Sequence, residues 1–275
     1  MDRGSTRFQG FRSDYVEACG VRQHALVAKG KGEGPTVALV HGLSAESTDL
    51  KNMFGFFRKR ARRVIAPDLP GHGLSEIPEG GMRAGGMMDT FSEALAKRLD
   101  GPAVLLGNSL GGLAVIRFAH LYPDLVRALI LIAPGGGQMS APQLNAFKAQ
   151  FPSPNRAEAR QFIDLLLTRP PWYRGIVERI VMHRFARPHI RELIDHVKPE
   201  HLLRPEEVAS LKVPTLLVWG GADHLQKGQF PFFRDHAPAH FKVEKPEGFS
   251  HCPFMDNAKR LNRLMAGYWE DLLQT

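Results

Sequence analysis

The stretch that decides the fold reads Gly107-Asn108-Ser109-Leu110-Gly111-Gly112. It fits the pattern G-x-S-x-G, follows the apolar run 103–106 and opens a helical stretch over 110–121. Between a buried strand and a helix, this pattern is typical of a sharp turn that exposes a nucleophilic serine at the C-terminal edge of a sheet. Glycines leave the room that so tight a turn requires. We therefore predict that Ser109 is a nucleophile.

Short runs that are apolar at every position recur on both sides of this turn. They occupy residues 36–40, 64–66, 103–106, 128–132 and 215–219. Such runs indicate strands buried on both faces. Helical stretches lie between them, and in 89–99 the side chains of Phe91, Leu95 and Leu99 form one apolar stripe. The alternation predicts an α/β fold with a mostly parallel sheet flanked by helices.

The two ends of the chain add further elements to this sheet. Residues 15–28 favour a hairpin at the sheet edge, and 241–244 is a last candidate strand. We expect a closing helix over 256–273, with Asp256 as its N-cap.

The alternation of strands and helices breaks once, between Pro134 and Pro214. This stretch contains no convincing buried strand, and 157–167 and 175–185 look helical. About 80 residues are too many for a simple loop. We expect a core formed by residues 1–134 and 213–275, with residues 135–212 inserted as a helical cap or lid.

A serine hydroxyl needs a neighbouring base, and that base needs an acid to orient it. Among twelve histidines, His251 lies in a loop after the last candidate strand and before the closing helix, where chain order Ser, acid, His requires the base. Asp223 directly follows the fifth apolar run, again at a C-terminal strand edge. The rival position after 128–132 reads Ala133-Pro134-Gly135-Gly136-Gly137 and offers no carboxylate. The predicted triad is Ser109, Asp223 and His251.

With these motifs the chain resembles the α/β-hydrolase superfamily over nearly its whole length. The matching stretches are His41-Gly42-Leu43, 68–75, the turn at Ser109, 219–223 and 248–251. The resemblance implies an α/β-hydrolase fold and an oxyanion hole formed by two backbone N–H groups. By resemblance these donors are Leu43 and Leu110. The resemblance also assigns Asp68 and His72 to holding a turn beside the active site. A role for His72 as a second base is the less favoured interpretation.

Serine at position 109 excludes the relatives that use an aspartate nucleophile, the haloalkane dehalogenases and epoxide hydrolases. Ester hydrolysis through an acyl-enzyme is the expected reaction, as in a carboxylesterase. A similarity to carbon–carbon hydrolases of meta-cleavage products is the alternative, although Leu43-Ser44-Ala45-Glu46 lacks their longer glycine-rich segment and no tryptophan closely follows His251. Thioester, amide and perhydrolase chemistry also remain open. A ligand-binding receptor with little turnover is the alternative of another class.

Composition limits the partners and the compartment. Cys19 and Cys252 lie too far apart to predict a disulfide framework or a zinc site, so no metal and no cofactor are expected. The net charge of +8 gathers partly in 58–63, which we interpret as a solvated helix end because no nucleic-acid motif is present. A polar start over 1–5 and short apolar runs predict a cytoplasmic protein without a membrane span.

The expected partner is a small-molecule substrate with an apolar acyl or alkyl group, which the cap would select. Oligomeric state is open. Trp172 and Tyr173 are candidates for either cap core or pocket lining. The cap arginines could meet an anionic substrate, although most fit solvated helix faces. They are Arg156, Arg160, Arg169, Arg174, Arg179, Arg184, Arg187 and Arg191. Cys252 is expected to be a small buried side chain.

Overall fold

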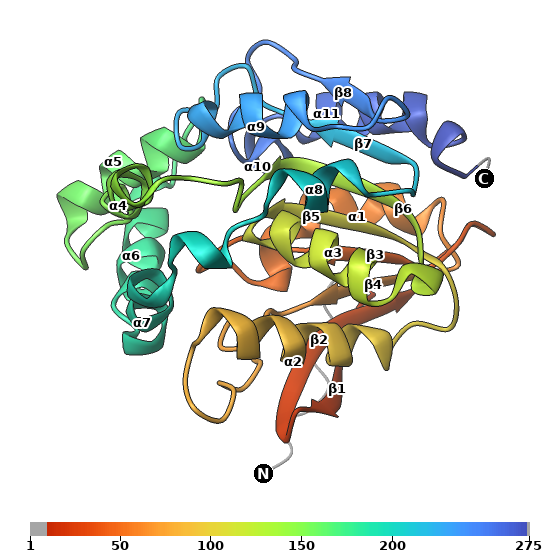
Figure 1. The fold of residues 1–275 in the computed structure, drawn as a ribbon, viewed down its shortest axis with the longest axis horizontal. Coiled ribbons are helices and arrows are strands. Elements are labelled where there is room, and N and C mark those ends of the chain that lie inside the picture. Colours follow the sequence, from red (N-terminus) through yellow and green to blue (C-terminus); the bar gives the residue numbers. More distant parts are fainter. Residues whose placement is uncertain (1–9, 274–275) are drawn as a thin grey trace.

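A computed structural model describes residues 10–273 of the chain, and within them eight strands form one sheet (Figure 1). The strand order is β1-β2-β4-β3-β5-β6-β7-β8. The strands are β1 (Arg12–Ala18), β2 (Val21–Lys29), β3 (Val37–Val40), β4 (Arg63–Pro67), β5 (Ala103–Ser109), β6 (Val126–Pro134), β7 (Thr215–Val218) and β8 (Lys242–Glu244). β1 and β2 form the expected edge hairpin, β2 also pairs antiparallel with β4, and the remaining pairs are parallel. The predicted α/β fold with a mostly parallel sheet is confirmed.

Helices cover both faces of the sheet. They are α1 (Lys51–Arg58), α2 (Ala84–Ala96), α3 (Leu110–Leu121), α4 (Ala141–Lys148), α5 (Arg156–Leu166), α6 (Arg174–Phe185), α7 (Pro188–His196), α8 (Pro205–Ala209), α9 (Phe230–Asp235), α10 (Pro253–Asp256) and α11 (Ala258–Tyr268). Short 3-10 turns are η1 (Ser47–Leu50), η2 (Pro123–Leu125), η3 (Pro199–His201), η4 (Lys227–Gln229) and η5 (Asp271–Leu273). The structure therefore provides the crossover helices that a parallel sheet needs.

Alternate residues of the central strands feed two hydrophobic layers. Leu39 and Leu106 face the layer that contains α1 and α11. Val40 and Leu105 face the opposite layer, which contains α2, α3 and α9. Because both faces are covered, these strands are apolar at every position rather than at every second one. That double burial is why their sequences were readable as strands.

The closing helix differs from the expectation for 256–273. It is broken into α10, α11 and η5, and Asn257 rather than Asp256 precedes α11. Asp256 ends α10, and its carboxylate accepts hydrogen bonds from Thr168 N–H, Thr168 Oγ1 and Ser250 Oγ. The N-cap prediction for Asp256 was wrong, because tertiary partners hold this side chain away from the helix that follows.

Residues between β6 and β7 add helices and no strand of the sheet. Helices α4 to α7 lie together at the left of Figure 1, to one side of the sheet layers. One isolated bridge, Gly137 with Leu203, ties the two ends of this segment together. The helices expected over 157–167 and 175–185 are α5 and α6, whereas α4, α7 and α8 were not predicted.

Two expectations concern the ends and the surface of the chain. The polar start at residues 1–5, used above to predict a cytoplasmic protein, lies outside the described residues. Within residues 10–273, no helix combines the length and apolar character needed to cross a membrane.

In the basic run 58–63, helix α1 ends at Arg58. Arg62 forms an ion pair with Asp100 at 2.9 Å, and both side chains are about half exposed.

The turn after β5 provides the first test of this packing. A Cβ at Gly107 would lie 2.3 Å from the carbonyl oxygen of Gly111, which belongs to the backbone and cannot give way. We expect Gly107→Ala to lower the free energy of unfolding by at least about 2 kcal/mol, measured by urea denaturation. Gly55→Ala is the matched control, because a Cβ there meets nothing within 4 Å on an exposed helical position. It should raise stability by up to about 1 kcal/mol. Equal effects of the two changes would contradict the tight-turn account.

Candidate active site

Ser109 occupies the turn between β5 and α3 in an unusual backbone conformation. Its φ is 53° and its ψ is −119°, a region that non-glycine residues rarely adopt. The Gly135 N–H donates to the Ser109 carbonyl at 2.8 Å, which fixes the turn against the end of β6. Strain of this kind persists only where the surrounding packing imposes it, and it is common at functional sites.

Asp223 and His251 come together although 28 residues separate them. Asp223 follows β7 and His251 lies in the loop after β8, so both extend from the same edge of the sheet. His251 Nδ1 lies 2.8 Å from Asp223 Oδ2, and both side chains are almost fully buried. Burial alone would raise the pKa of Asp223, but the adjacent His251 and the N–H groups of Gln226 and Leu225 lower it. The pair is therefore built to keep a carboxylate charged beside an imidazole.

The Ser109 hydroxyl has a partner that the sequence did not reveal. Gln226 Nε2 donates to Ser109 Oγ at 3.2 Å. Among the described residues no hydrogen bond joins Ser109 to His251, although both line one cavity. The only sequence signal for Gln226 was its position three residues after Asp223, whose Oδ1 accepts its backbone N–H at 2.9 Å. Gln226 thus connects the acid's loop to the serine.

Asn108 connects the same turn to the histidine loop. Its side-chain Nδ2 donates to the carbonyl oxygens of Ile132 and His251, at 3.0 and 3.1 Å. Cys252 is buried as expected, and its Sγ lies 3.8 Å from Asn108 Oδ1. Burial raises the pKa of the Cys252 thiol well above its ordinary value, so the thiol stays protonated at neutral pH. These contacts favour a packing role for Cys252 rather than a redox one.

The two predicted oxyanion donors, Leu43 and Leu110, line one cavity together with Ser109. Leu110 is the first residue of α3, where N–H groups lack a partner within the helix. Leu43 lies in the loop after β3, and no described residue accepts a hydrogen bond from its N–H. The next residue, Ser44, has a φ of 56°, so the loop turns sharply just after Leu43. The donor roles of Leu43 and Leu110 stay predictions, with both N–H groups free to act.

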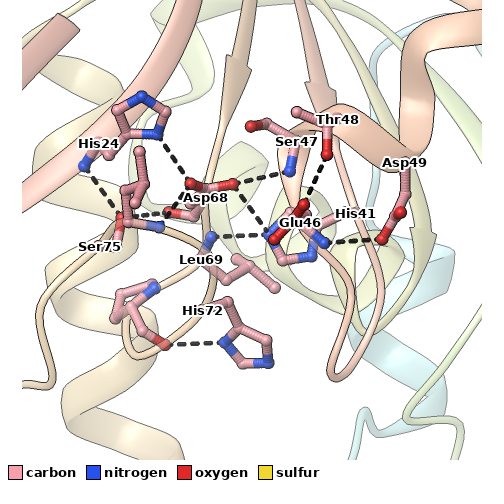
Figure 2. Close-up of polar contacts among 12 residues, drawn as sticks. His24, His41, Glu46, Ser47, Thr48, Asp49, Asp68, Leu69, His72 and Ser75 are labelled. Atoms are coloured by element: carbon pink, nitrogen blue, oxygen red, sulfur yellow. Dashed lines mark hydrogen bonds and ion pairs between the residues drawn. The ribbon is translucent and has the colours of Figure 1, made fainter. Parts of the chain in front are cut away.

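A buried network around Asp68 holds the loop that carries Leu43 (Figure 2). Asp68 Oδ2 lies 2.7 Å from His24 Nδ1, and Asp68 Oδ1 accepts the Ser47 N–H at 2.7 Å. His41 Nε2 accepts the Leu69 N–H at 3.0 Å, so the proton of neutral His41 lies on Nδ1, toward the Gly42 carbonyl. The network therefore joins the end of β4 to both sides of the Leu43 loop.

Asp68 is charged despite its burial. Desolvation would raise the pKa of Asp68, but the hydrogen bond from His24, the nearby His41 and the Leu74 N–H lower it to about 2. His72 behaves differently: burial, together with His41, lowers its pKa to about 3, so it is neutral at pH 7. Its Nδ1 lies 2.9 Å from the Pro70 carbonyl, and it lines neither of the cavities at Ser109. This placement agrees with the structural reading of His72 and opposes a role as a second base.

Arg184 ties helix α6 to the same loop. Its guanidinium lies 2.6 Å from Asp49 and 3.2 Å from Glu46, and it is mostly buried. Three other arginines of this segment surround the buried Glu178, namely Arg156, Arg160 and Arg174. These four arginines are therefore paired with carboxylates, which sequence reasoning did not predict, while Arg156 and Arg160 stay 66% and 59% exposed, as expected for solvated helix faces.

Two cavities meet at Ser109. The first, of about 100 Å³, also contacts Leu110 and Gln226, and the second, of about 240 Å³, contacts His251. Leu43 and Phe151 line both. Tyr173 lines the second cavity, whereas Trp172 is 95% exposed and is neither core nor lining. Within the described part of the chain, no group of three or more His, Cys, Asp or Glu side chains is arranged to hold a metal ion.

Comparison with known proteins places this chain in a family. A profile described as "Alpha/beta hydrolase family" matches residues 37–264. The chain belongs to the α/β hydrolase family. A pimeloyl-[acyl-carrier protein] methyl ester esterase from Neisseria meningitidis serogroup C is 30% identical over 257 residues, which cover 85% of this chain and 93% of that protein. The α/β-hydrolase fold and family predicted from the sequence are confirmed.

Solved α/β hydrolase structures share the fold at lower identity. The carboxylesterase of Bacillus subtilis has a TM-score of 0.75 at 19% identity, covering 94% of this chain and 91% of that one. The 2-hydroxy-6-oxo-6-phenylhexa-2,4-dienoate hydrolase of Rhodococcus sp. strain RHA1 has a TM-score of 0.77 at 21% identity, covering 94% and 99%. Since one architecture accommodates both chemistries, the choice between them depends on the site.

The low pKa of Asp68 gives a pH-dependent prediction. A carboxyl whose pKa falls from 3.8 to about 2 on folding contributes stability above pH 4, and loses it as the pH falls toward 2. We expect Asp68→Asn to cost at least about 2 kcal/mol at pH 7, with a deficit that shrinks below pH 4. Urea denaturation of both proteins from pH 7 to pH 3 measures this.

Asp124→Asn is the control for that experiment, because Asp124 is exposed and forms no ion pair among the described residues. Its effect should stay small at every pH. A deficit for Asp68→Asn that does not change with pH would contradict a charged Asp68.

Proposed function

We propose that this chain is a serine hydrolase that cleaves carboxylic esters through an acyl-enzyme, with Ser109 as nucleophile, His251 as general base and acid, and Asp223 as the orienting carboxylate. The observation that carries the proposal is the buried contact between Asp223 and His251, 2.8 Å, in a site that shares a cavity with the strained Ser109 turn. The relatives named methyl ester esterases support an ester as the substrate.

In the proposed mechanism each group takes one step. His251 takes the proton of Ser109 as Oγ attacks the ester carbonyl, and Asp223 stabilises the imidazolium that forms. The free N–H groups of Leu43 and Leu110 then stabilise the oxyanion, a contribution of about 3 kcal/mol for each donor. His251 protonates the departing alcohol, and water attacks the acyl-enzyme in a second cycle.

The first step requires a small rearrangement at Ser109. In the resting site its hydroxyl accepts a hydrogen bond from Gln226 Nε2. Rotation about the Cα–Cβ bond of the serine exchanges this partner for His251. Such hydrogen bonds often tighten only when substrate is bound.

We also infer that residues 135–212 act as a cap over the site. The inference is supported by the absence of sheet strands between β6 and β7 in the described chain, and by Phe151 and Tyr173 in the cavity walls. The Arg184 contacts with Asp49 and Glu46 attach the cap beside the predicted oxyanion donor Leu43. The lining is mostly apolar, which suits a small-molecule substrate with an apolar acyl or alkyl group.

The two alternatives, a carbon–carbon hydrolase and a ligand-binding receptor, have less support than ester hydrolysis. The short loop Leu43-Ser44-Ala45-Glu46 lacks the longer glycine-rich segment associated with carbon–carbon hydrolases. No contact among the described residues favours a receptor, and measured turnover separates the two readings, because the Asp223–His251 pair is compatible with both.

Variants of the triad test the proposal. With p-nitrophenyl butyrate, we expect Ser109→Ala to abolish turnover and His251→Ala to cost nearly as much, because the three groups act as a unit. Asp223→Asn should lower kcat by about 10⁴-fold, since the imidazole loses its orientation and its counter-charge. Steady-state kinetics and circular dichroism of the folded variants measure this. A fully active Asp223→Asn would exclude Asp223 as the acid.

A further inference from the structure

The two cavities at Ser109 are not equivalent in the proposed reaction. His251 must protonate the departing alcohol, and it lines only the second cavity. An ester bound for attack therefore directs its alcohol toward the second cavity. Its acyl chain extends into the first cavity, on the side of Leu110 and Gln226.

The first cavity changes character along its length. Helix α3 presents Leu110, Leu113 and Arg117 to it, at spacings that put all three on one helix face. Arg117 lies seven residues beyond Leu110, or about 10 Å along the helix axis. The side chains between are apolar, among them Met87, Met139, Leu144 and Ile194. A chain that enters beside Ser109 therefore meets apolar walls first and a guanidinium at a distance.

Two more basic residues, Lys148 and His201, line the same cavity, and none of its lining residues is acidic. Lys148 ends α4, and its Nζ donates to the backbone carbonyl of Asp195 at 2.9 Å. His201 Nδ1 accepts the Lys198 N–H at 3.1 Å, so neutral His201 carries its proton on Nε2 and can donate. All three side chains thus offer donors to a ligand.

The positive charges here are held in place but poorly neutralised. Arg117 Nη2 donates to the His201 carbonyl at 2.8 Å, and the carboxylate of Glu207 lies 4.0 Å from its Nε, at the limit of an ion pair. Lys148 forms no ion pair with any described residue. Backbone carbonyls fix both side chains without cancelling their charge, so both retain N–H donors for an anion.

Arg117, at this end of the cavity, is partly exposed at the surface. Arg117 also lines a separate surface hollow, whose other charged lining residues are Arg204, Glu206 and Glu207, and its side chain is 23% exposed. A charged group placed there keeps part of its hydration, which avoids most of the desolvation penalty of a buried ion. An anion is therefore more easily accommodated here than beside Ser109.

We propose that the preferred substrate is an ester whose acyl chain carries an anionic group at its far end, bound by Arg117 and Lys148 with His201 beside them. The apolar walls accommodate the chain, and the basic end sets its length and charge. The inference rests on the proposed ester hydrolysis, which supplies the direction of the acyl chain.

A matched pair of esters tests this directly. p-Nitrophenyl hydrogen suberate carries a terminal carboxylate, whereas p-nitrophenyl octanoate has the same chain length and no charge. We expect the ratio of kcat/KM, suberate over octanoate, to fall about tenfold or more in Arg117→Met and in Lys148→Met, because each change removes a hydrogen bond to a charged group. Lys212→Met, at an exposed site outside the cavity, removes the same charge and should leave the ratio unchanged.

The outcomes separate this inference from the proposed function. If wild type hydrolyses both esters through Ser109 but the ratio is unchanged in both cavity variants, the anionic subsite is wrong and ester hydrolysis stands. If folded wild type hydrolyses neither, ester hydrolysis is wrong. In that case the subsite is tested by calorimetric binding of monomethyl suberate to Ser109→Ala and to the same variant with Arg117→Met added. A Kd at least about tenfold higher in the double variant supports the subsite, and an unchanged Kd overturns it.

Discussion

The rest of the site depends on one steric constraint, the close approach of α3 to the central strands at the turn after β5. A Cβ at Gly111 would lie 2.4 Å from the carbonyl oxygen of Val40, so the start of the helix touches the end of β3 directly. This contact makes the chain reverse within a single residue, and that residue, Ser109, takes φ 53°. The same geometry points the N-terminus of α3 at the site, where its unpaired N–H groups and dipole favour negative charge.

Hydrogen bonds from several loops at this edge of the sheet hold that turn and the loops beside it. Asn108 fixes the His251 loop, Gln226 reaches the serine from the Asp223 loop, and Asp68 holds the loop of Leu43 from the side of β4. The Asp68 carboxylate is buried and charged, so its partners are costly to remove. The preorganisation of the site is therefore shared between backbone packing at one strand and side-chain networks at the strands around it.

Much of this was predictable from the sequence, and the limits have physical reasons. Strands buried on both faces are apolar throughout, which made β3 to β7 visible, and the glycines around Ser109 marked the turn. Gln226 and the contacts of Arg156 and Arg160 with Glu178 were not predictable, since their partners lie far away in sequence and only packing brings them together. Local propensity also misjudged Asp256, whose carboxylate bonds Thr168 and Ser250 instead of capping a helix. The basic end of the first cavity was likewise hidden, because Arg117, Lys148 and His201 come from three separate elements.

The central claim is that Ser109 is a nucleophile activated by the buried Asp223–His251 pair. Labelling with a fluorophosphonate probe, followed by intact mass, tests it most directly, because the probe reacts with activated serines and needs no knowledge of the substrate. The account predicts one adduct on wild type and on the surface control Ser210→Ala, and none on Ser109→Ala or His251→Ala. An unlabelled wild type that is well folded, or an adduct that persists in Ser109→Ala, would contradict it.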